Sequence, residues 1–176
     1  GWDMFSSLIL SNNLINLKDE TGMQLFQDLL TINKTSFVLP EFINPMTKTG
    51  CWGNGDSKIV SSMVFITIRN LLFIDNEERL DIFPMPQENW FTPGNEIIVE
   101  NAPSRFGLIS FRVVSTTNEI QIHFEQLPKY VPPDIMITLP FKTKIHQDDD
   151  FIVKKVIGNS HIINGWPSIL KLRRKG

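Results

Sequence analysis

Cysteine is nearly absent from the 176-residue sequence, which contains only Cys51. A single cysteine excludes an internal disulfide framework and any metal site built from cysteines alone. A thiol nucleophile needs a nearby base, and the sequence places none, so we interpret Cys51 as structural. One cysteine does not indicate whether the protein works in an oxidising or a reducing compartment. The amino terminus does not have the pattern of a signal peptide, and we favour a cytoplasmic location.

Positive charge and long apolar runs are also scarce. Seventeen Lys and Arg stand against 19 Asp and Glu, which gives a formal net charge of −2 and argues against a general nucleic-acid binder. The longest apolar stretch lies within residues 63–74, and Thr67, Arg69 and Asn70 interrupt it. It is too short and too polar to span a bilayer. We therefore expect neither nucleic acid nor a membrane as a partner.

Motifs of known catalytic or metal chemistry are missing as well. The three histidines, His123, His146 and His161, are far apart in sequence and have no paired-ligand spacing. The sequence contains no Gly-x-Ser-x-Gly elbow and no phosphate-binding Gly-rich loop ending in Lys-Ser/Thr. We expect no metal and no cofactor.

What the sequence does contain is a Gly/Pro-rich stretch over residues 40–56 that leads into an apolar segment. Prolines and glycines at this density predict a stiff loop. Asp56 or Ser57 is then a candidate N-cap for a helix over residues 57–74. The apolar positions that recur there at spacings of three and four are Val60, Met63, Val64, Ile68, Leu71 and Leu72.

The same spacing predicts shorter helices over residues 3–17 and 20–32, with Asp19 or Thr21 as a cap for the second. The helix over residues 57–74 is apolar around most of its circumference, which is typical of a helix with partners on several sides. Either the sheet that follows covers it, or protein outside this sequence does.

After Asn76 the pattern changes to alternation of apolar and polar residues, which indicates strands. We predict turns at residues 92–95, 116–118 and 132–134, and we assign Trp166 to a hairpin. The fold class is therefore α+β, with a helical segment over residues 1–76 and an antiparallel β-sandwich over residues 77–176. The predicted strands are 79–83, 96–100, 108–114, 119–124, 134–139, 151–157 and 168–172.

An ordered series of motifs over most of residues 36–140 resembles the carboxyl-terminal end of bacterial and archaeal glycoside-hydrolase-like proteins. The matching positions are Pro40-Glu41, Pro45, Gly50, Gly53-Asn54-Gly55, Arg69, Pro86 with Trp90, Thr92-Pro93-Gly94 and Ala102-Pro103-Ser104-Arg105-Phe106-Gly107. In that family an (α/α)6 toroid of paired helices, the six-hairpin glycosidase architecture, precedes a small β-sandwich. The resemblance implies that residues 1–76 are the last helices of such a toroid.

The sequence departs from the family pattern at two positions. The family's Gly-Asp-Gly is Gly-Asn-Gly here, with Asn54 at its centre, and a histidine often found before the second proline is Asn44. The resemblance also implies that the remaining toroid helices lie outside this sequence. The expected partners are a carbohydrate and the remainder of the same protein, or another chain, packed on the helices.

Glycoside hydrolysis normally requires two carboxyl groups about 5 to 10 Å apart. Glu41 and Asp56 are the only acids in the Gly/Pro-rich stretch. Glu41 is the candidate catalytic or hydroxyl-binding acid, and a loop-bracing carboxylate is the alternative. Asp56 is a candidate substrate ligand or an N-cap. We do not expect a complete catalytic pair from this sequence alone.

Trp52 either stacks on a sugar ring or fills a space between the helices and the sandwich. Together with Asn44, Asn54 and Asp56 it completes the candidate substrate-binding set. Trp90, Phe91 and Phe106 lie beside prolines in the sandwich, and we interpret them as residues that fill its corners.

Two functions follow from these features. The first is the carboxyl-terminal part of a carbohydrate-active enzyme, which forms one wall of a sugar-binding cleft and is inactive alone. The alternative is a free-standing sandwich module that binds a glycan or a protein. The sequence does not decide whether the chain is an enzyme.

Overall fold

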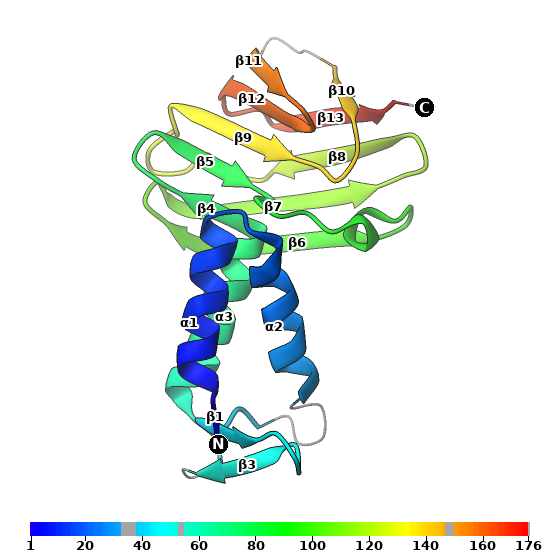
Figure 1. Cartoon of the computed structure of the whole chain (residues 1–176). Coiled ribbons are helices and arrows are strands. Elements are labelled where there is room, and N and C mark those ends of the chain that lie inside the picture. Colours follow the sequence, from blue (N-terminus) through cyan, green and yellow to red (C-terminus); the bar gives the residue numbers. More distant parts are fainter. Residues whose placement is uncertain (33–37, 53–54, 147–149, 176) are drawn as a thin grey trace. The chain divides into compact units, whose positions relative to one another are not determined.

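The computed structural model describes residues 1–32, 38–52, 55–146 and 150–175. The chain divides into two compact units, Gly1–Leu72 and Phe73–Gly176. Within these described ranges, the first contains three helices and a small sheet, and the second contains two five-stranded sheets. Figure 1 shows the elements of both units. The predicted α+β class, with helices first and a sandwich-like pair of sheets after them, is confirmed. The division falls after Leu72, a few residues before the boundary expected at residue 76.

The helices of the first unit are α1 (Met4–Asn16), α2 (Glu20–Ile32) and α3 (Lys58–Leu72). The predictions over residues 3–17 and 20–32 are confirmed. The predicted helix over residues 57–74 is wrong at its end, because Phe73–Asp75 forms strand β4 and pairs antiparallel with β5 (Arg79–Ile82). An apolar pair such as Phe73-Ile74 fits the periodicity of a helix and of a strand equally well.

Helix α1 packs against both α2 and α3. Helices α1 and α2 approach each other closely at Gly22 of α2, where an added Cβ atom would lie 2.7 Å from the Cβ atom of Leu14. The Ser11 hydroxyl donates a hydrogen bond of 2.7 Å to the Gly22 carbonyl. Glycine therefore sets the distance between α1 and α2. The buried apolar side chains of the three helices are Met4, Leu8, Ile15, Met23, Phe26, Leu29, Val60 and Leu71.

The Gly/Pro-rich stretch contains strands, which the prediction of a loop missed. Strands β2 (Phe42–Asn44) and β3 (Thr49–Trp52) form a hairpin, and β1 (Trp2–Asp3) adds a third antiparallel strand beside β2. The Asn44 side chain accepts the Met46 backbone N–H at 2.9 Å, and Lys48 N donates to the Asn44 carbonyl at 2.8 Å. This asparagine turn closes the hairpin without glycine at its tip.

The second unit contains two sheets with strand orders β11-β12-β9-β5-β4 and β10-β13-β8-β7-β6. Neighbouring strands are antiparallel except β5 and β9, which are parallel, so the purely antiparallel expectation is wrong at this pair. Each of the seven predicted strands is present, with ends shifted by up to four residues. The remaining bounds are β6 Glu96–Ser104, β7 Gly107–Ser115, β8 Glu119–Phe124, β9 Asp134–Thr138, β10 Thr143–Ile145, β11 Phe151–Ile157, β12 Ser160–Gly165 and β13 Ile169–Arg174, with the 3-10 helix η1 at Glu88–Phe91.

Phenylalanine side chains form the centre of the sandwich core. Phe83 lies edge-on to Phe91 and to Phe111, with ring centroids 5.1 and 6.0 Å apart. Phe73 of one sheet and Phe111 of the other are 6.5 Å apart, so the two sheets face each other across this cluster. Phe91 and Phe106 are buried, as expected of residues that fill the corners of the sandwich.

Trp166 does not lie in a hairpin, as the sequence had suggested. It follows β12 of one sheet and precedes β13 of the other, so residues 166–168 cross between the sheets. Gly165 has a φ of +110° where the chain leaves β12, a conformation that favours glycine. The Trp166 ring then packs 4.7 Å from the Phe124 ring.

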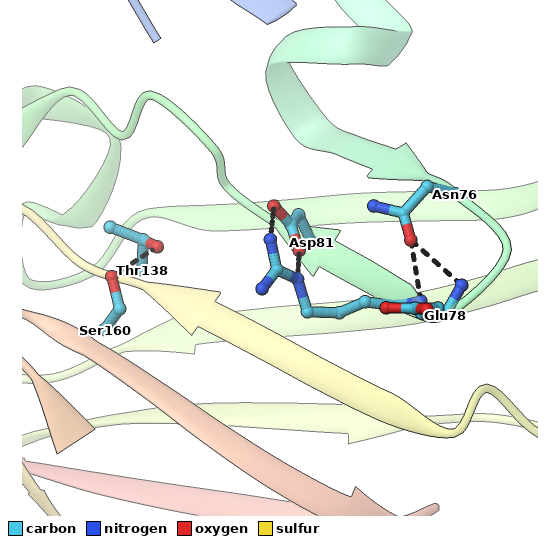
Figure 2. Close-up of polar contacts among 6 residues, drawn as sticks. Asn76, Glu78, Asp81, Thr138 and Ser160 are labelled. Carbon is cyan, nitrogen blue, oxygen red and sulfur yellow. Dashed lines mark hydrogen bonds and ion pairs between the residues drawn. The ribbon is translucent and has the colours of Figure 1, made fainter. Parts of the chain in front are cut away.

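Polar side chains brace the sheet that contains β5, as Figure 2 shows. The Asn76 side-chain oxygen accepts the backbone N–H groups of Glu78 and Arg79 at 3.0 and 2.9 Å, which fixes the turn between β4 and β5. The buried Asp81 is paired with Arg79. On the neighbouring strands, the hydroxyls of Thr138 and Ser160 lie 2.9 Å apart.

Candidate functional site

A pocket of about 290 Å³ lies in the helical unit and includes Glu41, the candidate catalytic residue. We name it the Glu41 pocket. Its walls come from the start of α1, the segment around β2, and the start of α3. The lining residues are Asp3, Phe5, Glu41, Phe42, Ser57, Ile59 and Val60.

Backbone hydrogen bonds hold these three segments together. Met4 N donates to the Glu41 carbonyl at 2.9 Å, and Ser57 N donates to the Leu39 carbonyl at 2.9 Å. The segment that contains Glu41 is therefore tied to the first turns of α1 and α3. The Ser57 hydroxyl also donates to Glu41 Oε1 at 3.3 Å.

Asp3 is a second carboxylate in this pocket, and the sequence did not reveal it as a site residue. Its two oxygens accept the Ser6 backbone N–H at 3.0 Å and the Ser6 hydroxyl at 2.7 Å. These bonds, the backbone one first, lower the pKa of Asp3 below its ordinary value. An Asp immediately before a helical pattern predicts an N-cap. That signal does not show that the capping residue also lines a pocket.

Trp52 lies beside this pocket through its contact with Phe42. The two rings are stacked, with centroids 5.6 Å apart and an interplanar angle of 28°. Phe42 lines the pocket, and Trp52 is 75% exposed at the end of β3. Trp52 therefore offers an aromatic surface beside the pocket.

The other candidate residues do not line the Glu41 pocket. The Asn44 side-chain oxygen accepts the N–H groups of Met46 and Thr47 in the hairpin turn. Asp56 is exposed, and Ser57 caps α3 instead, because its Oγ accepts the Val60 N–H at 3.5 Å and its carbonyl accepts the Ser61 N–H. Asn54, also a candidate substrate ligand, lies outside the residues that the structure describes.

The pocket is suited to binding rather than to a complete hydrolytic step. Glu41 offers an acceptor for hydroxyl groups, while Phe5, Phe42 and Ile59 offer apolar walls. Both Asp3 oxygens are already hydrogen-bonded in the cap of α1. Within the described ranges, no three His, Cys, Asp or Glu side chains gather in a way that could hold a metal ion. Among the helices of that same part of the chain, none is long and apolar enough to cross a membrane.

Comparisons of the chain with models of protein families, with curated proteins and with solved structures find no match. The resemblance to glycoside-hydrolase-like proteins therefore stays a prediction from the motifs.

Proposed function

We propose that the chain is the carboxyl-terminal part of a carbohydrate-active enzyme of the glycoside-hydrolase-like kind. In this proposal the Glu41 pocket and Trp52 form one wall of a sugar-binding cleft, and the sandwich is a structural domain. The acids that complete hydrolysis lie on helices that this sequence does not include.

The observation that carries the proposal is the position of Glu41 beside the exposed Trp52–Phe42 pair. Sugar rings present C–H groups on their faces and hydroxyls at their edges, so they bind where an aromatic surface adjoins a carboxylate. Trp52 supplies the surface, and Glu41 supplies an acceptor at the neighbouring pocket. An aromatic side chain with one face packed and the other exposed is common in binding sites.

A second observation supports the idea that more protein packs on the helices. Helix α3 exposes Ile59, Phe65, Ile66 and Ile68, and α1 exposes Ile9 and Leu10. We name these six side chains the exposed apolar residues. Single exposed apolar residues are ordinary on a protein surface, whereas several large ones on one helix mark an interaction surface. The remaining helices of a toroid are a suitable partner for them.

The free-standing module remains the second candidate, because the sandwich has a core of its own. Phe83, Phe91 and Phe111 pack there against one another. In this alternative the sandwich folds as a unit around its own core and binds a glycan or a protein by itself.

Two measurements on the 176-residue chain test the proposal. In affinity electrophoresis through gels that contain neutral polysaccharides, we expect retardation by at least one polysaccharide and its loss in Trp52→Ala. We also expect no hydrolysis of nitrophenyl glycosides. Met46→Ala is the matched control, since Met46 is exposed in the same hairpin. Retardation that survives Trp52→Ala, or hydrolysis by the chain alone, contradicts the proposal.

A further inference from the structure

The sandwich unit has a pocket of its own, of about 520 Å³, which we name the Arg174 pocket. Residues of η1 and the turn after it form one side, among them Glu88, Phe91 and Thr92. Phe141, which lies between β9 and β10, and Arg174 at the end of β13 form the other side. The proposed sugar cleft uses none of these residues.

The Arg174 guanidinium is held firmly in this pocket. Its Cζ atom lies 4.0 Å from the centroid of the Phe141 ring, and one of its Nη atoms donates to the Phe91 carbonyl. The Arg174 backbone N–H also donates to the Asn118 carbonyl at 2.9 Å. The charge is therefore placed by the Phe141 ring and the Phe91 carbonyl, and the backbone bond to Asn118 fixes the end of β13.

The Arg174 charge shares its pocket with the exposed carboxylate of Glu88. Among the described residues, no Asp or Glu forms an ion pair with Arg174. Its Nε–H is buried and has no hydrogen-bond partner within that described part of the chain. The buried Nε is out of reach of a ligand, so a ligand in the pocket meets the guanidinium through its Nη atoms. Guanidinium groups pair best with carboxylates. The arrangement is suited to an anionic ligand whose carboxylate meets Arg174.

The other residues that line the Arg174 pocket restrict the chemical class of that ligand. Glu88 is exposed at the pocket and can accept hydrogen bonds from hydroxyl groups, and Thr92 contributes a hydroxyl. The half-buried ring of Phe141 offers an apolar contact for C–H groups, and the buried Phe91 ring lies behind it with the ring centroids 6.3 Å apart. A ligand with one carboxylate, several hydroxyls and an apolar ring face satisfies all three kinds of group.

We propose that the Arg174 pocket binds a hexuronic acid, with the sugar carboxylate on the Arg174 guanidinium. The choice of a sugar rests on the proposed function, while the requirement for a carboxylate rests on Arg174 alone. The site is separate from the Glu41 pocket, which lies in the other unit.

The test is isothermal titration of the 176-residue chain with sodium glucuronate, with glucose as the neutral probe and cyclohexanecarboxylate as the carboxylate without hydroxyls. We expect a dissociation constant of roughly 1 mM or lower for glucuronate, in the range of small polar ligands. Both other probes should bind at least about tenfold more weakly. No binding of glucuronate, or equal binding of either comparison probe, overturns the proposal.

Two variants locate the binding. Arg174→Gln should weaken glucuronate binding at least about tenfold, because the charge-assisted bonds are lost. Glu88→Gln should strengthen it about twofold or more, because a nearby like charge is removed while a hydrogen-bonding group stays. Glu88 is exposed, so this variant is informative even if Arg174→Gln unfolds. Unchanged binding in Glu88→Gln or in a folded Arg174→Gln contradicts the site.

Failure of this proposal is distinguishable from failure of the proposed function. Trp52→Ala should bind glucuronate as the parent chain does, and Arg174→Gln should keep any retardation by neutral polysaccharides. Loss of glucuronate binding in Trp52→Ala would show that glucuronate binds at the Glu41 pocket, and it would overturn the Arg174 assignment.

Discussion

The indole of Trp52 stacks on the phenyl ring of Phe42, with the ring centroids 5.6 Å apart, and its exposure is still 75%. Removing the indole should therefore cost little stability. We expect Trp52→Ala to change the free energy of unfolding by less than about 1 kcal/mol, the scale of an aromatic pair at the surface. Urea unfolding measures this change. A loss of several kcal/mol would show that Trp52 is a core residue.

The same exposure predicts a spectroscopic result. Trp52 is the most solvent-exposed of the four tryptophans, with Trp2 next at 39%. Its removal should shift the fluorescence emission maximum of the folded chain to shorter wavelength, because the remaining indoles are less hydrated. Trp2→Ala, the comparison variant, should give a smaller shift. An unshifted or longer-wavelength maximum in Trp52→Ala would contradict this geometry.

Gly22 is the position in the helical unit where a small substitution should have a large effect. An added methyl group would lie 2.8 Å from Ser11 O and from Ile15 N, and backbone atoms cannot move aside cheaply. We expect Gly22→Ala to destabilise the helices by about 2 kcal/mol or more, although alanine is the better helix former. Gln24→Ala, on the exposed side of α2, should cost less than about 0.5 kcal/mol. Urea unfolding, monitored by the circular dichroism of the helices, gives the free energy of unfolding of each variant. Equal values for Gly22→Ala and Gln24→Ala would refute the close contact.

His161 should make the sandwich less stable in mild acid. Its ring is buried, with Nε2 2.8 Å from the Thr143 hydroxyl, and burial first and the charge of Lys175 second lower its pKa below 6.5. Below about pH 6.5 the unfolded chain binds this proton more readily than the folded chain, so stability falls as the pH falls. Carboxylates with lowered pKa values, such as Asp3, lose their stabilising contribution only at lower pH.

Urea midpoints at pH 7.5 and 5.5 test this dependence. His161→Gln should reduce the difference between the two midpoints, because the side chain no longer titrates. An unchanged difference in His161→Gln would show that another group is responsible.

The sequence predicted most of the fold because its periodicities are local. The turns at residues 92–95 and 116–118 were predicted from their residue types, and hydrogen bonds such as Asn95 N to Thr92 O at 2.9 Å form them. The missed strands have other causes. Strand β10 has only three residues, Thr143–Ile145, too few for an alternation to be visible. Strand β4 directly follows a helix with the same apolar character.

The candidate site was predicted only in part. Glu41 and Trp52 were identified from their types and their flanking residues, and the structure places both at or beside one pocket. Asp3 joins them through the pairing of β1 with β2, across about forty residues of sequence, which no local pattern shows. The Arg174 pocket was missed for the same reason, because η1 and β13 meet only in the folded chain. In the sequence, Arg174 is one of four basic residues near the end, Lys171, Arg173, Arg174 and Lys175, and nothing in that run singles it out.

Self-association offers a further prediction about the exposed apolar residues. Phe65 is 71% exposed on α3. We expect the double change Phe65→Gln with Ile66→Gln to lower the tendency of the chain to associate, without loss of stability beyond about 1 kcal/mol. Leu127→Gln is the matched control, because Leu127 is equally exposed but lies in the sandwich unit. If Leu127→Gln has the larger effect, association does not proceed through the helices.

The molar mass of the purified 176-residue chain, measured by light scattering across a range of concentrations, tests the central claim most directly. If the helices are an incomplete part of a larger toroid, the mass should exceed that of the 20.2 kDa monomer and rise with concentration, and the Phe65→Gln, Ile66→Gln double variant should reverse the rise. A monodisperse monomer at every concentration, with one cooperative melting transition, would contradict the claim and favour the free-standing module.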